Sequence, residues 1–330
     1  MDASQQDPGR FEHRLPLEPV KHKLDQIRSQ MGNVIVGQES LIDDLLAVML
    51  SGGHALIEGM PGVAKTLAAK LLARTIEAGF SRIQFTPDLM PADILGTSVF
   101  NPEKAIFEFK PGPIFSQIIL IDEINRAPAK TQAALFEVME ERQVTVDGHT
   151  YPMQEPFVVL ATQNPVEQEG TYRLPEAQLD RFMFKIVVDY PTAGEEVEIL
   201  KRHHHERLET MLAQVKPVVT ADEILAFRDL VRQISVEDPI LSYIANIVSS
   251  TRNHPLLFLG ASPRASLALL QAAKAFALME GRDFVTPEDV KRNTGSVLAH
   301  RIIVKPEKEM EGITPHDVID QIIHHVEVPR

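Results

Sequence analysis

The stretch that decides the fold runs from His54 to Thr66, with the sequence HALIEGMPGVAKT. The short apolar segment at 54–57 predicts a strand, and leucines at helical spacing after Thr66 predict a helix. A loop with glycines, ending in Lys-Thr, joins the two. Unpaired backbone N–H groups in such a loop and at a helix N-terminus point at one place, so the stretch is a candidate binding site for phosphate.

The loop residues divide the expected tasks of a nucleotide site among them. Lys65 carries a positive charge for the β- and γ-phosphates of a nucleotide, and the hydroxyl of Thr66 can ligate Mg²⁺. Ala64 departs from the general pattern, which has glycine before the lysine, so a flexible connection with an incidental lysine is the alternative. The residues expected to contact the nucleotide here are Gly59, Pro61, Gly62, Val63, Ala64, Lys65, Thr66 and Leu67.

A second motif supplies the acidic half of the site. Four apolar residues at 118–121 precede Asp122 and Glu123. An unbroken apolar run is typical of a parallel strand buried on both faces, and ligands bind beyond the carboxyl ends of such strands. Asp122 is therefore expected to hold Mg²⁺, and Glu123 to orient and deprotonate the attacking water. A surface acidic pair is the alternative, but the preceding phosphate loop favours the nucleotide site.

Composition limits the class of protein. The 330 residues exceed one ordinary core, and 44% hydrophobic with 24% charged residues is typical of a folded protein. The absence of cysteine excludes disulfides and thiolate metal sites. No apolar run approaches the roughly 18 residues of a membrane span, and no signal peptide is evident, so a soluble cytoplasmic protein is expected. The formal charge of −13 disfavours sequence-independent nucleic-acid binding.

Three parts are expected along the chain. Residues 1–16 form a mobile N-terminal lead, 17–190 an α/β core, and 191–330 a smaller helical domain. Two hairpins are predicted inside the core, at 99–109 and around the Asp147-Gly148 turn, whose residues suit a type I′ connection. Helix starts are predicted at Thr220, Ser262, Thr286 and Thr314. The run of histidines at 203–205 is interpreted as solvated helix surface rather than a metal site.

Asn164 follows another buried strand, predicted at 157–162. Its amide at a strand end can hydrogen-bond the attacking water or the γ-phosphate of the nucleotide. The alternative is that Asn164-Pro165 merely starts a loop. The residue alone does not decide between the two.

Four motifs together resemble the AAA+ ATPases and, within them, the MoxR family. They are Gly-x-Pro-Gly-x-Ala-Lys-Thr at 59–66, Ile-Asp-Glu-Ile-Asn-Arg-Ala at 121–127, Ala-Thr-Gln-Asn-Pro at 161–165 and Glu-Ala-Gln-Leu-Asp-Arg-Phe at 176–182. The resemblance covers nearly the whole chain from about residue 17, and alanine before the lysine is common in this family. It implies an α/β fold: a P-loop AAA+ core with a five-stranded parallel sheet in the order 5-1-4-3-2, plus an all-helical lid domain.

The resemblance also implies roles for residues outside the two central motifs. Asn164 resembles sensor 1, and Arg181 resembles the arginine finger that reaches the neighbouring subunit's γ-phosphate. Arg264 resembles sensor 2, acting on its own subunit's nucleotide. Arg173 is a nearby competitor for the finger, and an ion pair of Arg181 with Asp180 or Glu176 is the alternative. Val36, Gly37 and Gln38 are expected on the adenine side.

The activity that the resemblance implies is Mg²⁺-dependent hydrolysis of ATP to ADP and phosphate. Such proteins form rings, usually hexamers, and act in a chaperone-like manner on partner proteins that carry a von Willebrand A domain. A magnesium-chelatase-like AAA+ motor subunit is the main alternative. A nucleic-acid motor is a further alternative, which the acidic charge disfavours. A nucleotide-binding scaffold without turnover is another, which the presence of Glu123 disfavours.

Overall fold

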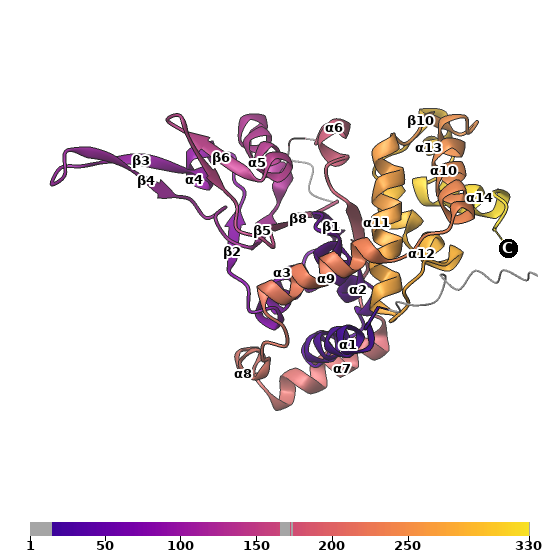
Figure 1. Ribbon diagram of the computed structural model, residues 1–330, viewed down its shortest axis with the longest axis horizontal. Coiled ribbons are helices and arrows are strands. Elements are labelled where there is room, and N and C mark those ends of the chain that lie inside the picture. The colour runs from indigo at the N-terminus through magenta and orange to yellow at the C-terminus, as the bar shows by residue number, and fades with distance from the viewer. Residues whose placement is uncertain (1–14, 166–171, 173, 330) are drawn as a thin grey trace, which may run out of the picture.

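A computed structural model describes residues 15–165, 172 and 174–329. Most of the N-terminal lead predicted for 1–16 therefore lies outside the described residues, as does Arg173. Figure 1 shows an α/β part, from which a long hairpin projects, beside a set of helices formed by the C-terminal third of the chain. Within the described residues, no helix is both long and apolar enough to cross a membrane.

A parallel sheet forms the centre of the α/β part. Its strands are β1 (Ala55–Gly59), β2 (Phe80–Gln84), β5 (Ile118–Asp122), β8 (Val158–Gln163) and β9 (Phe184–Val188). They lie in the order β2-β5-β8-β1-β9, and all neighbouring pairs are parallel. Counted in chain order, this is the predicted order 5-1-4-3-2. Every residue of β5 is buried, as the apolar run before Asp122 predicted.

Two layers of helices cover the sheet, because alternate strand residues point to opposite faces. Ala55 and Ile57 join one core cluster, whereas Leu56 joins the other. The first cluster includes α1 (Glu18–Gly32), α2 (Glu39–Ser51) and α3 (Lys65–Thr75). The second includes α4 (Pro91–Leu95), the 3₁₀ turn η1 (Ile124–Arg126) and α5 (Ala129–Glu141), with α6 (Glu176–Leu179) packed at its border.

Both predicted hairpins are present. The first pairs β3 (Gly96–Asn101) with β4 (Ile106–Pro111), and the second pairs β6 (Gln143–Val146) with β7 (His149–Pro152). Asp147 and Gly148 have φ of 51° and 78°, both positive as a type I′ turn requires. The hairpins touch, because the ring of Phe109 stacks on Tyr151 with 4.3 Å between centroids.

The C-terminal part is helical, as predicted, with one short antiparallel strand pair in addition. Its helices are α7 (Ala193–His205), α8 (Leu208–Gln214), α9 (Ala221–Gln233), α10 (Asp238–Arg252), α11 (Pro263–Met279), α12 (Pro287–Leu298), α13 (Pro306–Met310) and α14 (Pro315–His325). The strand pair joins β10 (Leu257–Leu259) and β11 (Ile303–Val304).

The expected helix starts are confirmed, with one difference in capping. Thr220, Thr286 and Thr314 cap their helices with side-chain hydrogen bonds. Ser262 precedes α11 without such a bond, and its hydroxyl instead donates to Asp180. The exposed histidines at 203–205 lie at the end of α7, and the described residues contain no cluster suited to a metal ion.

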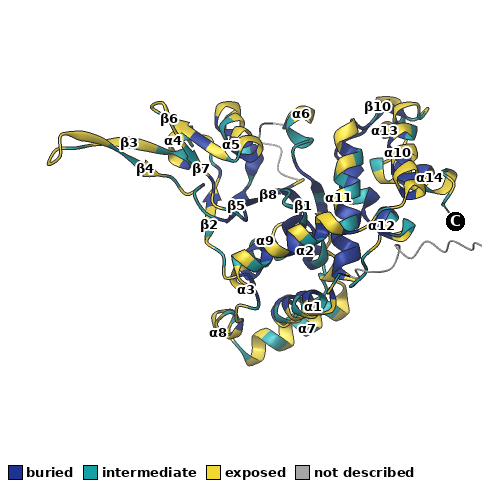
Figure 2. Ribbon diagram, in the orientation of Figure 1, coloured by how far each residue is buried: buried dark blue, intermediate teal, exposed yellow. Residues whose placement is uncertain are grey.

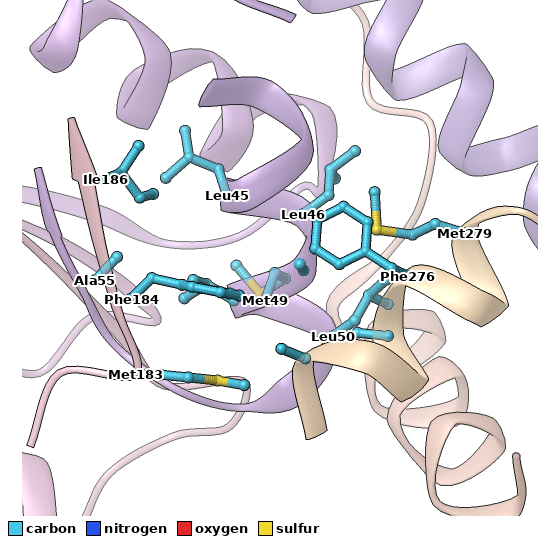
Figure 3. Packing of buried hydrophobic residues seen from close by; sticks show 14 of the residues in the cluster. Leu45, Leu46, Met49, Leu50, Ala55, Met183, Phe184, Ile186, Phe276 and Met279 are labelled. Atoms are coloured by element: carbon cyan, nitrogen blue, oxygen red, sulfur yellow. The ribbon is translucent and has the colours of Figure 1, made fainter. Parts of the chain in front are cut away.

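Helix α2 joins the sheet to the C-terminal helical part, residues 191–329, which is called the lid from here on. In Figure 3, Met49 and its neighbours on α2 lie between Phe184 of β9 and Phe276 of α11. One hydrophobic cluster therefore continues from the α/β part into the C-terminal helices. The division at residue 190 stays a prediction, because the two parts share this core.

Candidate nucleotide-binding site

The two halves of the predicted site meet at the carboxyl edge of the sheet. In the register of the sheet, Gln84 of β2 stands beside Asp122 of β5, and Glu58 of β1 stands beside Gln163 of β8. Strand β1 leads into the phosphate loop, and α3 begins directly at Lys65. Parallel strands thus bring the loop, the acidic pair and the end of β8 to one edge, where ligands bind in such sheets.

The phosphate loop requires left-handed backbone at two positions. Gly62 has φ of 89°, and Ala64, the N-cap of α3, has φ of 62° and ψ of 15°. An added Cβ at Gly62 would meet no atom within 4 Å, so the backbone there faces open space. Ala64 therefore occupies a conformation that favours glycine, which explains why glycine is usual before the lysine.

Lys65 is directed to the ends of β1 and β8. Its ammonium donates a hydrogen bond to the carbonyl oxygen of Gly59 and lies 3.4 Å from that of Gln163. The positive charge therefore stands at the carboxyl edge of the sheet, directly beside the loop, which is the place that the sequence predicted for it.

Asp122 is almost fully buried, with 6% of its surface exposed. Its Oδ1 accepts a hydrogen bond from the hydroxyl of Thr162 at 3.1 Å, and its Oδ2 accepts one from Arg82 Nε at 2.5 Å. The same hydroxyl accepts the backbone N–H of Glu123 at 3.0 Å. Thr162 on β8 thus orients both members of the acidic pair.

Glu123 has an unusual backbone conformation, with φ of 59° and ψ of 53°. Such left-handed geometry at a non-glycine residue is costly and is concentrated at functional sites. Its Oε2 accepts a hydrogen bond from Gln84 Nε2 at 2.7 Å and pairs with Arg126 Nε at 3.2 Å. The carboxylate is therefore restrained from two sides.

Four residues that contact the acidic pair were not predicted from the sequence: Arg82, Gln84, Arg126 and Thr162. Gln84 and Thr162 are polar residues at or next to the end of a sheet strand, which is the signal that could have identified them. Using that signal requires the strand order and the register, because both decide which strand ends are neighbours. Arg82 and Arg126 carry no comparable local signal.

These groups suit ATP and Mg²⁺. The loop offers a helix N-terminus and open backbone to a polyanion, and Lys65 adds a positive charge. The oxygens of Thr66 and Asp122 are hard donors of the kind that Mg²⁺ prefers. Asn164, 8% exposed, follows directly after β8 on the same edge.

The residues predicted for the adenine side line a separate cavity of about 260 Å³. Val36 and Gly37 belong to its wall, together with Arg28, Asp43 and Arg202. Gly37 has φ of 70°, and a Cβ there would collide with the carboxylate of Glu195. The positive φ therefore favours glycine at position 37, whereas the Glu195 carboxylate ends a flexible side chain that can move aside.

Glu140 on α5 is the acidic partner of both predicted arginines. Arg264 Nη2 lies 3.1 Å from one oxygen of this carboxylate, and Arg181 Nε lies 3.9 Å from the other. Arg181 also donates from Nη1 to the carbonyl oxygen of Phe136 at 2.5 Å. The partners considered for Arg181 from the sequence alone, Asp180 and Glu176, were wrong.

His54, the first residue of the quoted stretch, is structural. It is buried, and burial lowers the pKa of its imidazole to about 4, so the ring is neutral. Its Nδ1 accepts the backbone N–H of Val159 at 2.9 Å, and its Nε2 lies 3.2 Å from the carbonyl oxygen of Met139. The ring thereby joins the start of β1 to β8 and α5.

The chain is similar to known ATPases along both of its parts. A family model described as "ATPase family associated with various cellular activities (AAA)" matches residues 54–184, and one described as "AAA lid domain" matches 249–322. The crystal structure of a Cytophaga hutchinsonii protein with a provisional ATPase designation superposes with a TM-score of 0.88 at 43% identity. That match covers 95% of this chain and 97% of the other.

Two curated relatives extend over nearly the whole chain. Uncharacterized protein YeaC of Bacillus subtilis is 46% identical over 94% of this chain and 97% of its own length. Chaperone MoxR1 of Mycobacterium tuberculosis is 42% identical over 94% of this chain and 83% of its own length. A magnesium-chelatase 38 kDa subunit of Chlorobaculum parvum, which represents the predicted alternative, is more distant at 27% identity. Because the similarity to Chaperone MoxR1 includes the lid as well as the phosphate loop, this chain belongs to the MoxR family of AAA+ ATPases.

Proposed function

We propose that this protein binds ATP with Mg²⁺, hydrolyses it to ADP and phosphate, and uses the reaction to remodel partner proteins. The observation that carries the proposal is the meeting of Lys65, Asp122 and Glu123 at one edge of the sheet. A positive charge for phosphate, a metal-binding carboxylate and a candidate base are the groups that phosphoryl transfer to water needs.

Each residue has one task in this mechanism. The loop and Lys65 bind and orient the phosphates, and Thr66 and Asp122 would hold Mg²⁺, which would supply positive charge against the transferred phosphoryl group. Glu123 accepts the proton of the attacking water, and Asn164 orients that water. Gln84 and Arg126 both contact Oε2 of this carboxylate, so they limit how far Glu123 can turn toward the water. We therefore propose that these two contacts influence how often Glu123 reaches the attacking water.

The active assembly is proposed to be a ring, a hexamer as in the family, in which Arg181 reaches the nucleotide of the neighbouring subunit. From the sequence, Arg264 was expected to act on its own subunit's nucleotide. Both arginines contact Glu140 of their own chain, so each guanidinium has to leave this carboxylate to reach a phosphate.

Proteins with a von Willebrand A domain are the proposed clients, and the β3–β4 hairpin is the proposed contact. The hairpin extends away from the body of the molecule, and Figure 2 shows that most of it is exposed. Phe107 is 72% exposed, and the only ring that contacts it among the described residues is that of Phe100, 5.3 Å away between centroids. Exposed apolar surface of this kind marks interaction sites.

The catalytic assignment is tested by two substitutions with different expected losses. Lys65→Ala should abolish ATP binding. Glu123→Gln should retain binding but hydrolyse ATP at least about a hundredfold more slowly, the range of general-base catalysis. Measured ATP affinity and turnover of both proteins separate the two effects. Equal hydrolysis by Glu123→Gln and the parent protein would exclude Glu123 as the base.

The client assignment is tested by trapping. Glu123→Gln held in ATP should retain the client in a pull-down, whereas Lys65→Ala should not. A second protein, with Gly-Ser replacing 101–104 and Phe107→Ser, should keep ATP affinity and melting temperature. It should lose stimulation of ATP hydrolysis by the trapped client. Unfolding of this variant, or an intact response to the client, would limit the hairpin to local packing.

A further inference from the structure

The turn that carries Arg181 is held by the lid. This turn, at 180–183, joins α6 to β9, and Arg301 from the segment between α12 and β11 contacts it repeatedly. Arg301 Nε donates to Asp180 Oδ1 at 2.7 Å, and its Nη2 donates to the carbonyl oxygens of Asp180 and Phe182 at 3.2 and 2.7 Å. Its Nη1 donates to the carbonyl oxygen of Met183 at 3.1 Å.

Two more lid residues complete this attachment. His300 Nε2 lies 2.9 Å from the carbonyl oxygen of Phe182, and the hydroxyl of Ser262 donates to Asp180 Oδ2 at 3.2 Å. Ser262 is the residue before α11, so two separate segments of the lid hold the same turn. The Arg301 side chain is 3% exposed, and its guanidinium donates to this turn and, from Nη1, also to the carbonyl oxygen of Val297 on α12.

The attachment also determines the partners of Arg181. Asp180 is its sequence neighbour and would be an available carboxylate, but Arg301 occupies one oxygen of Asp180 and Ser262 the other. Arg181 instead extends to Phe136 and Glu140 on α5, where its guanidinium is part-buried rather than paired with its neighbour. The negative charge of Asp180 is thus balanced by Arg301 and not by Arg181.

We propose that Arg301 is a positioning residue for Arg181: it fixes the Asp180–Met183 turn to the lid, so that the lid of one subunit sets where that subunit's Arg181 points. This inference rests on the proposed trans role of Arg181. The fork of the guanidinium matters, because lysine would bring one point charge and could not hold the carbonyl groups of the turn together. A displacement of a catalytic group by 1 Å can cost about a hundredfold in rate.

The test uses subunit mixing, in which the two roles are separated. A Lys65→Ala subunit cannot bind ATP but can lend its Arg181, and an Arg181→Ala subunit can bind ATP but needs a borrowed arginine. Mixing these two proteins should restore hydrolysis, because an arginine finger contributes roughly 10³ in rate. Arg301→Lys is then added either to the lending subunit or to the borrowing subunit.

The expected result is asymmetric. In the lending subunit, Arg301→Lys should reduce the restored kcat by about ten- to a hundredfold and leave KM for ATP unchanged. In the borrowing subunit, which has no Arg181, the same substitution should have little effect. Arg282→Lys in the lending subunit is the matched control. Arg282 forms a bidentate ion pair with Asp289 in the lid, with 2.7 Å for each hydrogen bond. The Arg282→Lys substitution should leave the restored hydrolysis intact.

Each other outcome contradicts the inference in a recognisable way. Equal losses from Arg301→Lys in both subunits would assign Arg301 a structural role only. An unchanged recovery with Arg301→Lys in the lending subunit would show that the turn holds its position without the fork. Absence of recovery in the parent pair, despite demonstrated co-assembly, would overturn the trans role of Arg181 itself and this inference with it.

Discussion

The side-chain amide of Gln84 donates a hydrogen bond to the carboxylate of Glu123, with 2.7 Å between Nε2 and Oε2. Gln84 ends β2 and stands beside Asp122 in the sheet, so it is a fixed part of the edge on which the acidic pair lies. The bond holds the proposed base from the side of β2, while Arg126 holds it from η1. The position of Glu123 in this structure is therefore set by Gln84 and Arg126, which lie outside the phosphate loop.

Removal of this hydrogen bond should raise basal hydrolysis. In Gln84→Ala, Glu123 loses one of its two restraints and reaches the attacking water more often. A hydrogen bond to a charged group contributes about 1.5–3 kcal/mol, and about 1.4 kcal/mol corresponds to a factor of ten, so kcat at saturating ATP should rise by at most about a hundredfold. Steady-state ATPase assays measure it. The double variant with Glu123→Gln should be inactive, and a lower kcat in Gln84→Ala would mean that Gln84 holds Glu123 in its working orientation.

Loss of the Thr162 hydroxyl should weaken the acidic half of the site. Thr162→Val keeps the shape of the side chain but leaves Asp122 Oδ1 and the Glu123 N–H each without this partner. We expect the free energy of unfolding to fall by about 1–3 kcal/mol and the Mg²⁺ concentration for half-maximal hydrolysis to rise. Urea unfolding and Mg²⁺ titration measure the two effects. Thr162→Ser, which keeps the hydroxyl, should behave like the parent protein, and an unaltered Thr162→Val would refute the role given to Thr162.

Ala64 should tolerate glycine and reject a branched residue. Its φ of 62° costs a non-glycine residue about 1–2 kcal/mol, which Ala64→Gly removes at the expense of a more flexible unfolded chain. The variant should therefore bind ATP normally, with a free energy of unfolding equal to or slightly above that of the parent protein. Ala64→Val should weaken both. Nucleotide titration and urea unfolding are the measurements, and loss of ATP binding in Ala64→Gly would contradict this account of the loop.

Asp44 should make the protein less stable as the pH rises. Burial raises the pKa of this carboxyl from its ordinary 3.8 to about 7, against the opposing effects of Arg292 and Ser296. The folded state thus keeps a proton that the unfolded chain releases near pH 4, so the contribution of Asp44 to stability declines between pH 4 and pH 7. Asp44→Asn should raise the urea midpoint at pH 8 and leave it nearly unchanged at pH 4.

The adjacent residue provides the control for this prediction. Asp43 pairs with Arg28 at 2.6 Å and with Arg292 at 2.5 Å, which joins α1 and α12 through α2. Asp43→Asn should therefore lower the urea midpoint at pH 8, opposite to Asp44→Asn. If both variants shifted the midpoint in the same direction, the protonation of Asp44 would not be the cause.

Local sequence determined the elements and their order. An apolar run that ends in Asp122-Glu123, a loop that ends in Lys65-Thr66, and turn residues such as Asp147-Gly148 each encode their structure within a few residues. Strand, phosphate loop, hairpins and most helix starts were predicted for this reason and are present. The sheet order came from family resemblance and is confirmed. The roles of the site residues stay predictions.

Only the tertiary structure decided which side chains contact the proposed site residues. Gln84 meets Glu123 across 39 positions of sequence, and Arg301 meets Asp180 across 121, so no local pattern indicates either contact. The same holds for Glu140, which neither arginine motif points to. Periodicity and turn chemistry specify which element forms, because they act over a few neighbouring residues. Which side chains then face one another depends on strand register and on how the lid packs against α2, and both are set by burial of the core as a whole.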